Sequence, residues 1–419
     1  MSSPRVILCV DIGTSSLKAA FIDTEGHSQG FTRETYGPGP VSADGWERAL
    51  ARALGVLFSQ AGSCHAICIS GNGPTLVPLT RSGETLAPLH WYQGPPGSRA
   101  PQKDPAIRSF FLPHVVRFRQ EHPGDYEKTR YFISAQEWLS WRLGADPVTA
   151  LPGAYEPYYW DDAQCQLLDV DPGKFPPFVG LGTHIGRLSP EAVRRLSELA
   201  GGFAEERLPG GIPIIAGGVD FIMALIGTGA TEPGMVCDRA GSSEGINFCT
   251  ALPGMVTAPG LSAELRVLPH VSPGLWNISV IIPSSGRLFE RYRALTGQEH
   301  RAYDDTLAEL IPGGILEPSE LGQAVLMSMG FEVRAAVNTL NRHGFPVTGM
   351  RLSGGQCKNR RWNQLKADLT GTELLVPEQP DSELGGDAVL GAVALGEAAD
   401  LPEGIRRIVH IQERYTPDA

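Results

Sequence analysis

The stretch VILCVDIGTSSLKAAFID, residues 6–23, is the most informative part of the sequence. An apolar run ends at Asp11, crosses a turn of small residues, and resumes as a second apolar run that ends at Asp23. This alternation predicts a β-hairpin with a polar tip. The tip has the parts of a phosphate-binding loop, because Gly13 permits close backbone approach and Lys18 follows within reach of an anion. An ordinary hairpin with a polar tip is the alternative.

Length and charge limit the classes of protein that fit. A chain of 419 residues with 42% apolar residues is long enough for two hydrophobic cores, so we expect two domains. The formal net charge of -11 argues against a nucleic-acid backbone or an anionic membrane as partner, because either would require a basic surface. No apolar stretch approaches the length of a membrane span.

The cysteine pattern and the first residues bear on the compartment. The seven cysteines form an odd set without a CxxC pair, and several lie inside apolar runs, which predicts buried free thiols. The first strand follows Met1 almost immediately and leaves no room for a signal peptide. We therefore expect a cytoplasmic protein.

Strand and helix patterns alternate along the chain, which is typical of α/β folds. At residue 212 the pattern starts afresh, and the hairpin VCDRAGSSEGINF at 236–248 echoes CVDIGTSSLKAAF at 9–21. This weak internal similarity predicts two related halves, each with a polar hairpin tip at a shared cleft. We expect one domain over residues 1–211 and a second over 212–419, with a hinge near 212.

A glycine turn in the second half is a candidate nucleotide site, with a plain tight turn as the alternative. The strand VTGMRLSGG runs into Gly354 and Gly355 and is followed by the helical pattern NRRWNQLKADLTG. A strand, a glycine turn and a helix can present backbone amides to a nucleotide. The turn lacks the GxGxxG spacing and the acidic residue of a nicotinamide site, which excludes a dehydrogenase.

The chain resembles the FGGY carbohydrate kinases, which have the fold of actin, hexokinase and Hsp70. Four blocks carry the resemblance: DIGTSSLK at 11–18, AGGVD at 216–220, AGSSEG at 240–245, and the long block RLSGGQCKNRRWNQLKADLTGTELLVPEQPDSELGGDAVLGAVALG at 351–396. The resemblance implies an α/β protein of two ribonuclease-H-like (actin-like ATPase) domains flanking a central cleft. It also implies an ATP-dependent kinase that transfers the γ-phosphate to a hydroxyl of a small sugar or polyol. ATP and Mg²⁺ would be held mainly by the second domain, and the substrate mainly by the first.

The family motifs assign roles to particular residues. Asp220 matches the family's base, which takes the proton of the attacking hydroxyl; its alternative role is to cap the following helix. Asp11 would hold Mg²⁺ directly or through water. The resemblance implies phosphate contacts from Gly13, Thr14, Ser15 and Lys18 in the first hairpin and from Gly241, Ser242 and Ser243 in the second. The residues that would border the adenosine are Gly354, Gly355, Gln356 and Asn359.

The sugar side departs from the family pattern. Where family members commonly show a tryptophan, an aspartate two positions on and then an arginine, this chain has Trp91 and Gln93. An amide replaces the carboxylate and offers a different set of hydrogen bonds to a polyol. Pentulose kinases often have a histidine where this chain has the segment GNGPT, so that contact is missing, and Asn72 in this segment is a candidate for binding the sugar. Glu137 is a candidate substitute for the acidic residue that the family has before the aromatic residue in SAQEW. An exposed helix glutamate is the alternative for Glu137.

The second half is shorter than is usual in the family. The loop that normally precedes the helix near residue 324 and lines the cleft is missing. The alternative to a kinase is therefore a catalytically impaired homologue that binds nucleotide or sugar or acts in regulation. A third possibility is an acid kinase or ATPase of the same superfamily. The aromatic segment GAYEPYYWDD at 153–162 is a candidate subunit contact of a homodimer or a substrate lid, or it packs within the first domain.

Overall fold

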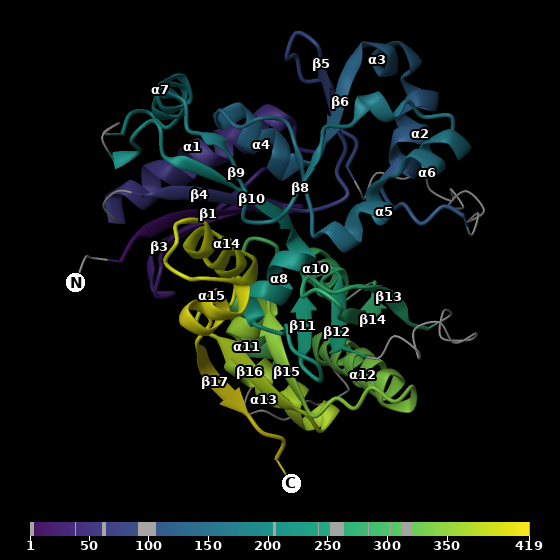
Figure 1. The fold of residues 1–419 in the computed structure, drawn as a ribbon. Helices are drawn as coiled ribbons and strands as arrows, with labels where there is room; N and C mark the ends of the chain where they lie inside the picture. The colour runs from purple at the N-terminus through teal and green to yellow at the C-terminus, as the bar shows by residue number, and fades with distance from the viewer. Residues whose placement is uncertain are drawn as a thin grey trace. The chain divides into compact units, whose positions relative to one another are not determined.

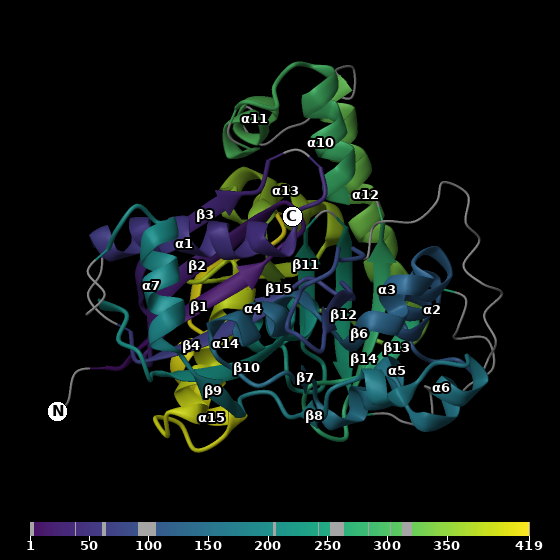
Figure 2. The same ribbon diagram turned by 90° about the horizontal axis from the view of Figure 1, so that it is seen from above.

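The computed structural model describes residues 4–37, 39–60, 64–90, 106–203, 207–241, 243–251, 264–283, 285–301, 303–311 and 321–418 (Figures 1 and 2). The chain forms two compact units. The first holds Met1–Met223 and Glu383–Ile408, and the second holds Ala224–Ser382 and Val409–Ala419. Trp91, Gln93 and Ser242, which the sequence analysis assigned to the site, lie outside the described residues.

The first unit is built on a six-stranded sheet with the order β3-β2-β1-β4-β10-β9. Two further pairs, β5-β6 and β7-β8, lie outside this sheet. The strands of the first unit are β1 (Val6–Ile12), β2 (Ser16–Asp23), β3 (Ser28–Thr35), β4 (Ala66–Gly71), β5 (Val77–Thr80), β6 (Thr129–Ile133), β7 (Thr149–Ala150), β8 (Phe178–Val179), β9 (His184–Arg187) and β10 (Pro213–Val219). Its helices are α1 (Ala43–Gln60), α2 (Leu112–Glu121), α3 (Pro123–Lys128), α4 (Ala135–Leu143), α5 (Glu156–Tyr159), α6 (Asp162–Leu167), α7 (Pro190–Leu199) and α15 (Leu401–Ile408).

Two helices span the limits between the units. They are α8 (Asp220–Thr228), which begins in the first unit, and α14 (Ser382–Ala394), whose residues from Glu383 on belong to it.

The second unit is built on a seven-stranded sheet with the order β13-β14-β12-β11-β15-β16-β17. Its strands are β11 (Val236–Ala240), β12 (Glu244–Thr250), β13 (Arg266–Pro269), β14 (Trp276–Ile282), β15 (Gly349–Ser353), β16 (Glu373–Pro377) and β17 (Ile411–Tyr415). Its helices are α10 (Ser285–Leu295), α11 (Tyr303–Leu310), α12 (Leu321–Arg342) and α13 (Arg360–Thr370).

The two sheets repeat one topology. In the first, β1 is antiparallel to β2 and parallel to β4, and β4 is parallel to β10. In the second, β11 is antiparallel to β12 and parallel to β15, and β15 is parallel to β16. An antiparallel strand, β9 or β17, closes the corresponding edge in each. This repetition confirms the expected pair of ribonuclease-H-like α/β domains.

The cores follow from the sequence pattern. Every residue of β1 and β4 is buried, which is expected of central strands covered on both faces and agrees with their unbroken apolar runs. On one side of the first sheet α1 packs beside α7 (Figure 2). In the second unit α12 packs against β12, β14 and α13. None of the helices within the described ranges is long and apolar enough to cross a membrane.

The limits of the first unit, Met1–Met223 with Glu383–Ile408, differ from the domain limits of 1–211 and 212–419 that we expected. The strand β10, which we expected to open the second domain, pairs with β4 and β9 in the first sheet. Helix α14 also packs there, since Gly386 lies so close to Met223 that a Cβ would fall 2.4 Å from the carbonyl oxygen of Met223. The first unit is therefore made of two stretches that are far apart in the sequence.

Candidate active site

The carboxyl ends of three neighbouring parallel strands bring several predicted site residues together in the first unit. In the register of the sheet, Asp11 on β1 lies opposite Ser70 on β4, and Gly71 lies opposite both Ile12 and Val219. Asp220 follows Val219 directly. Ligands of α/β proteins bind at such strand ends, so Asp11 and Asp220 are located where a site is expected.

Asp11 is paired with the lysine of its own hairpin. The two residues are register partners on β1 and β2, and Lys18 Nζ lies 3.2 Å from Asp11 Oδ2. Lys18 Nζ also lies 3.9 Å from Glu383 Oε2, at the start of α14. Asp11 and Glu383 are both nearly buried, at 2% and 3% exposure. Two carboxylates thus share one ammonium group, and the sequence analysis had not singled out Glu383.

The tip of the first hairpin is closed by its own backbone. The amide of Gly13 donates to the carbonyl oxygen of Ser16 at 2.9 Å, and the amide of Tyr36 donates to that of Ser15 at 3.2 Å. Thr14 is half-buried and Ser15 is exposed. The tip therefore presents Thr14 and Ser15 at the surface of the unit, as a phosphate contact requires.

Asp220 is the first residue of α8 and is half-buried. Its Oδ1 accepts the backbone N–H of Phe221 at 2.7 Å. This bond comes from the next residue, so it is not the bond from the second or third helical N–H that a cap accepts. A carboxylate at this place also faces the positive end of the helix. The role of Asp220 as a base stays a prediction.

A second carboxyl group, absent from our expectations, lies beneath these strand ends. Asp387 on α14 is fully buried and accepts hydrogen bonds from Ser70 Oγ at 3.0 Å and Cys68 Sγ at 3.5 Å. Burial, and secondarily the charge of Asp11, raises the pKa of Asp387 well above its usual value. Burial thus disfavours a second negative charge beside Asp11.

The candidates for sugar binding fare differently. Asn72 is buried, and its Oδ1 accepts a hydrogen bond from Thr75 Oγ1 at 2.7 Å. Glu137 is also buried rather than exposed, because Oε2 accepts the N–H of Ser134 at 2.7 Å and Oε1 that of Ala150 at 2.9 Å. Both carboxylate oxygens thus accept backbone N–H groups, and the bond from Ser134 is part of a capping box at the start of α4. Desolvation raises the pKa of Glu137 to about 7.

The aromatic segment at 153–162 packs within the first unit. Tyr155, Tyr159 and Trp160 are buried. The Trp160 ring stacks on Phe175 and Phe178 with centroids 4.4 and 4.1 Å apart. Packing inside the first domain, one of the three uses considered for this segment, is therefore the one observed.

In the second unit, the hairpin of β11 and β12 carries the other predicted phosphate contacts. At its tip the amide of Gly241 donates to the carbonyl oxygen of Ser243 at 2.9 Å, and Ser243 is half-buried. Directly below the tip, Lys366 Nζ contacts Asp238 Oδ2 at 2.8 Å and Glu244 Oε1 at 2.7 Å. The second hairpin thus rests on a buried ionic cluster.

The predicted adenosine segment lies against this hairpin. Gly354 has a φ of 102°, and a Cβ there would fall 2.0 Å from the carbonyl oxygen of Ala240, at the end of β11. Gly355 is exposed, whereas Gln356 is buried and donates from Nε2 to Ser285 Oγ at 3.3 Å. Asn359 caps α13, with Oδ1 accepting the N–H of Trp362 at 2.9 Å. Glycine is therefore required at 354 to bring the turn beside the hairpin.

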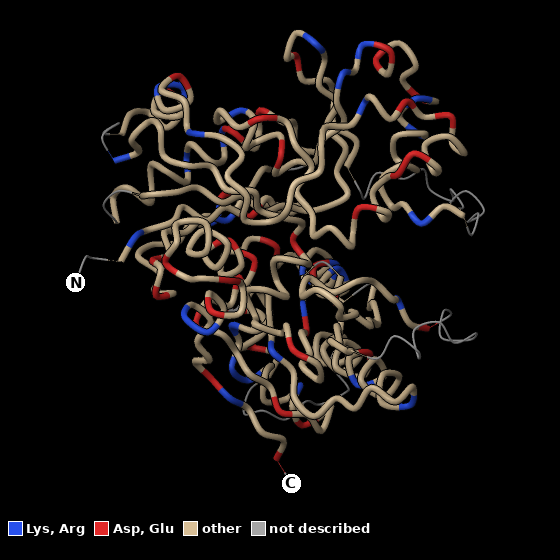
Figure 3. Tube along the Cα trace, viewed as in Figure 1, with Lys and Arg blue, Asp and Glu red and all other residues tan. Residues whose placement is uncertain are grey.

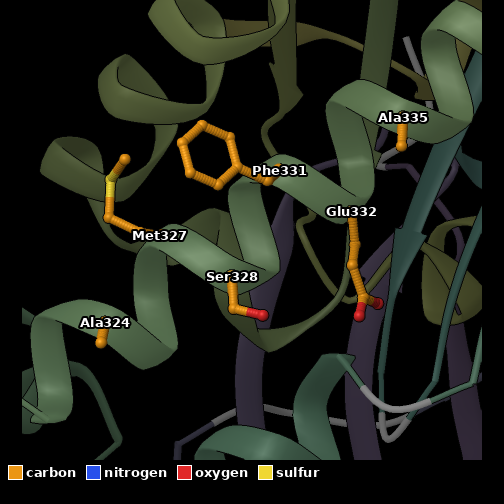
Figure 4. A pocket seen from close by; sticks show the side chains of 6 residues that line it. All are labelled: Ala324, Met327, Ser328, Phe331, Glu332 and Ala335. Atoms are coloured by element: carbon orange, nitrogen blue, oxygen red, sulfur yellow. The ribbon is translucent and has the colours of Figure 1, made fainter. Parts of the chain in front are cut away.

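A surface hollow on α12 includes none of these residues. It is lined by Ala324, Met327, Ser328, Phe331, Glu332 and Ala335 (Figure 4).

Basic and acidic residues are interspersed along both units (Figure 3). Within the described ranges, no group of three His, Cys, Asp or Glu side chains is arranged to hold a metal ion.

Comparisons with known proteins agree with the geometry. Residues 293–395 match the model of the C-terminal domain of the FGGY family of carbohydrate kinases. Xylulose kinase of Escherichia coli strain K12 is 21% identical over 478 aligned residues, which cover 98% of this chain and 94% of the relative.

Solved structures show the same fold. Gluconate kinase from Lactobacillus acidophilus superposes with a TM-score of 0.76 at 17% identity, over 99% of this chain and 94% of its own. Glycerol kinase from Plasmodium falciparum with ADP gives a TM-score of 0.75 at 15% identity, over 99% and 94%. The second half is thus similar to the C-terminal domain of the FGGY carbohydrate kinases, and the chain is similar to a carbohydrate kinase along nearly its whole length.

Proposed function

We propose that this protein is an ATP-dependent carbohydrate kinase that transfers the γ-phosphate to a hydroxyl of a small sugar or polyol. Similarity to the FGGY carbohydrate kinases supports the reaction class. The observation that carries the assignment to this chain is the location of Asp11 and Asp220 at the carboxyl ends of β1 and β10, the two parallel strands that flank β4 in one sheet.

In this proposal Asp220 is the general base. Phosphoryl transfer needs the attacking oxygen in line with the bond that breaks, and a group that takes the proton of the hydroxyl. Asp220 is half-buried, so its carboxylate reaches the surface of the unit, while the bond from Phe221 fixes one of its oxygens.

Mg²⁺ would be held near Asp11 through water. Because Asp11 Oδ2 already contacts Lys18, and Glu383 shares the same ammonium group, the donor set fits a water-mediated contact better than a direct one. Mg²⁺ usually keeps several water ligands and binds through one or two carboxylates and the phosphates of the substrate. When bound, the ion would neutralise charge on the phosphates.

The nucleotide is assigned to both hairpin tips and to the glycine turn. Gly13, Thr14, Ser15 and Lys18 would contact the phosphates from the first unit. Gly241, Ser242 and Ser243 would do so from the second, and Gly354, Gly355, Gln356 and Asn359 would border the adenosine. The acceptor would be held by Asp220 with Asn72, Trp91 and Gln93. Glu137 is withdrawn from this set because both of its oxygens bind backbone amides. We expect the enzyme in the cytoplasm, without nucleic acid or membrane as partner, and a homodimer stays a prediction.

An acceptor screen tests the proposal. The full chain is incubated with MgATP and D-xylulose, glycerol, D-gluconate or a series of pentitols, while ADP release and the phosphate ester are measured. We expect ester formation with at least one acceptor. Acceptor-independent ADP release would favour an ATPase instead. Nucleotide binding without any ADP release would support the catalytically impaired homologue and contradict the proposal.

A further inference from the structure

Two buried polar side chains of the first unit, Gln136 and Tyr159, make no hydrogen bond within the described part of the chain. Gln136, on α4, is 2% exposed, and neither Oε1 nor Nε2 has a partner. Tyr159, at the end of α5, is 1% exposed, and its hydroxyl group has none. An unsatisfied buried polar group costs about 1–3 kcal/mol, so two of them close to one site require an explanation.

Both groups lie beside the end of β4. A Cβ added to Gly71 would fall 3.0 Å from Gln136 Oε1, so the glutamine amide contacts the backbone of Gly71. A Cβ added to Gly73 would fall 3.8 Å from the hydroxyl oxygen of Tyr159 and 3.0 Å from Val219 Cγ1. Val219 directly precedes Asp220, the proposed base. The Gln136 amide and the Tyr159 hydroxyl group therefore lie beside the segment that leads to the proposed base.

The Tyr159 ring packs against two phenylalanine rings. It stacks on Phe111 with centroids 5.3 Å apart and meets the edge of Phe110 at 5.0 Å. Burial raises the pKa of the Tyr159 hydroxyl well above its usual value, with smaller contributions from the charges of Glu137 and Asp220. The hydroxyl therefore stays protonated, and the negative charge of Asp220 acts on it.

The neighbouring charges restrict the class of ligand. The amide and the hydroxyl are neutral and can each donate and accept a hydrogen bond. Asp220 and, where it is ionised, Glu137 add negative charge that acts on the Tyr159 hydroxyl. An acceptor with a carboxylate at this position would be repelled, whereas neutral hydroxyl groups would pair with both side chains.

We propose that Gln136 and Tyr159 form a hydroxyl-binding subsite next to Asp220, which selects neutral ketoses or polyols over sugar acids. The inference rests on the proposed kinase function and specifies its acceptor. The subsite would supply hydrogen bonds to the acceptor's hydroxyl groups adjacent to the one that reacts. A site built to bond hydroxyl groups loses affinity when its own polar groups are removed.

The test compares Gln136→Leu and Tyr159→Phe with the wild type and with Tyr158→Phe as the matched control. Tyr158 is the half-buried neighbour of Tyr159 and has no part in the subsite. Binding of D-xylulose, glycerol and D-gluconate is measured by calorimetry in the presence of MgADP, alongside thermal unfolding and, where turnover occurs, the KM values for acceptor and ATP.

We expect each subsite variant to weaken binding of the neutral acceptor by about tenfold or more, which corresponds to the loss of one hydrogen bond to a buried partner. The unfolding temperature should be unchanged or higher, since an unsatisfied polar group is removed. The KM for ATP should stay the same, and Tyr158→Phe should behave as wild type. A merely structural role would instead lower the unfolding temperature and leave acceptor binding unchanged.

Three results would overturn the subsite. They are unchanged acceptor binding in both variants, preferential binding of D-gluconate by the wild type, and no binding of any of the three compounds. Acceptor binding that is lost in the variants, in a wild-type protein that forms no phosphate ester, would support the subsite and reject the kinase proposal. The two claims therefore fail separately.

Discussion

The ammonium nitrogen of Lys366 lies 2.7 Å from Glu244 Oε1, with both side chains buried below the tip of the second hairpin. Asp238 shares the same lysine at 2.8 Å. Ser285 Oγ donates to the other Glu244 oxygen at 2.5 Å and accepts from Gln356. These contacts join β11 and β12 to α10, to α13 and to the glycine turn, which are the segments assigned to the nucleotide.

Replacing the lysine alone should destabilise the chain strongly. Lys366→Met would leave two buried carboxyl groups without their cation, and breaking a buried ion pair in this way costs about 3–5 kcal/mol. Urea unfolding measures the change. As a control, the triple variant Asp238→Val, Glu244→Leu and Lys366→Met removes the whole cluster and should recover most of the loss. A single variant as stable as the wild type would contradict the ionic role of the cluster.

The same cluster predicts a pH dependence of folding. Burial, and next the charge of Glu244, raise the pKa of Asp238 to about 8 against the opposing effect of Lys366. The folded chain therefore keeps this proton between about pH 4 and pH 8, where the unfolded chain has released it. Stability from this group is complete below about pH 4 and is lost as the pH rises towards 8.

Asp238→Asn removes that loss because the side chain is neutral at every pH. The free energy of unfolding of this variant minus that of the wild type should increase between pH 5 and pH 8. Urea titrations at four pH values within this range measure the difference. A difference that stays constant or decreases with pH would show that Asp238 is ionised in the folded chain.

Adjacent glycines provide a matched pair of variants. Gly354→Ala places a Cβ in a left-handed backbone conformation and 2.0 Å from the carbonyl oxygen of Ala240, so we expect a loss of more than about 2 kcal/mol. A Cβ at Gly355 meets nothing within 4 Å, so Gly355→Ala should change stability by less than about 0.5 kcal/mol. Because Gly355 is assigned to the adenosine, its variant should nevertheless raise the KM for ATP. Equal stabilities of the two variants would contradict this account of the turn.

Local patterns were sufficient to predict the hairpins. The apolar runs on either side of the tip residues fix both the strand type and the register that puts Lys18 opposite Asp11. The all-buried cysteines also follow from their apolar neighbours, and every one of them is a buried free thiol in the structure. These features depend on residues close together in the chain, so the sequence alone contains the necessary information.

Long-range partners could not be predicted in this way. Glu383 and Asp387 reach the end of β1 and β4 from a helix more than 300 positions further along, and no periodicity in the sequence indicates that packing. Glu137 is a different case, because the Ser134–Glu137 spacing is that of a capping box and was available as a signal for a structural role. Gln136 and Tyr159 were missed because a lone amide or phenol has no distinguishing pattern until its burial is known.

Turnover by Asp220→Asn tests the central claim most directly. The amide keeps the size of the side chain and the bond from Phe221 but cannot take the proton of the acceptor hydroxyl. With MgATP and the best acceptor of the wild type, we predict a fall in kcat of about 10²–10⁴-fold, with the dissociation constant of ATP and the unfolding temperature unchanged. A variant that forms the phosphate ester at the wild-type rate would contradict the role of Asp220 as the base.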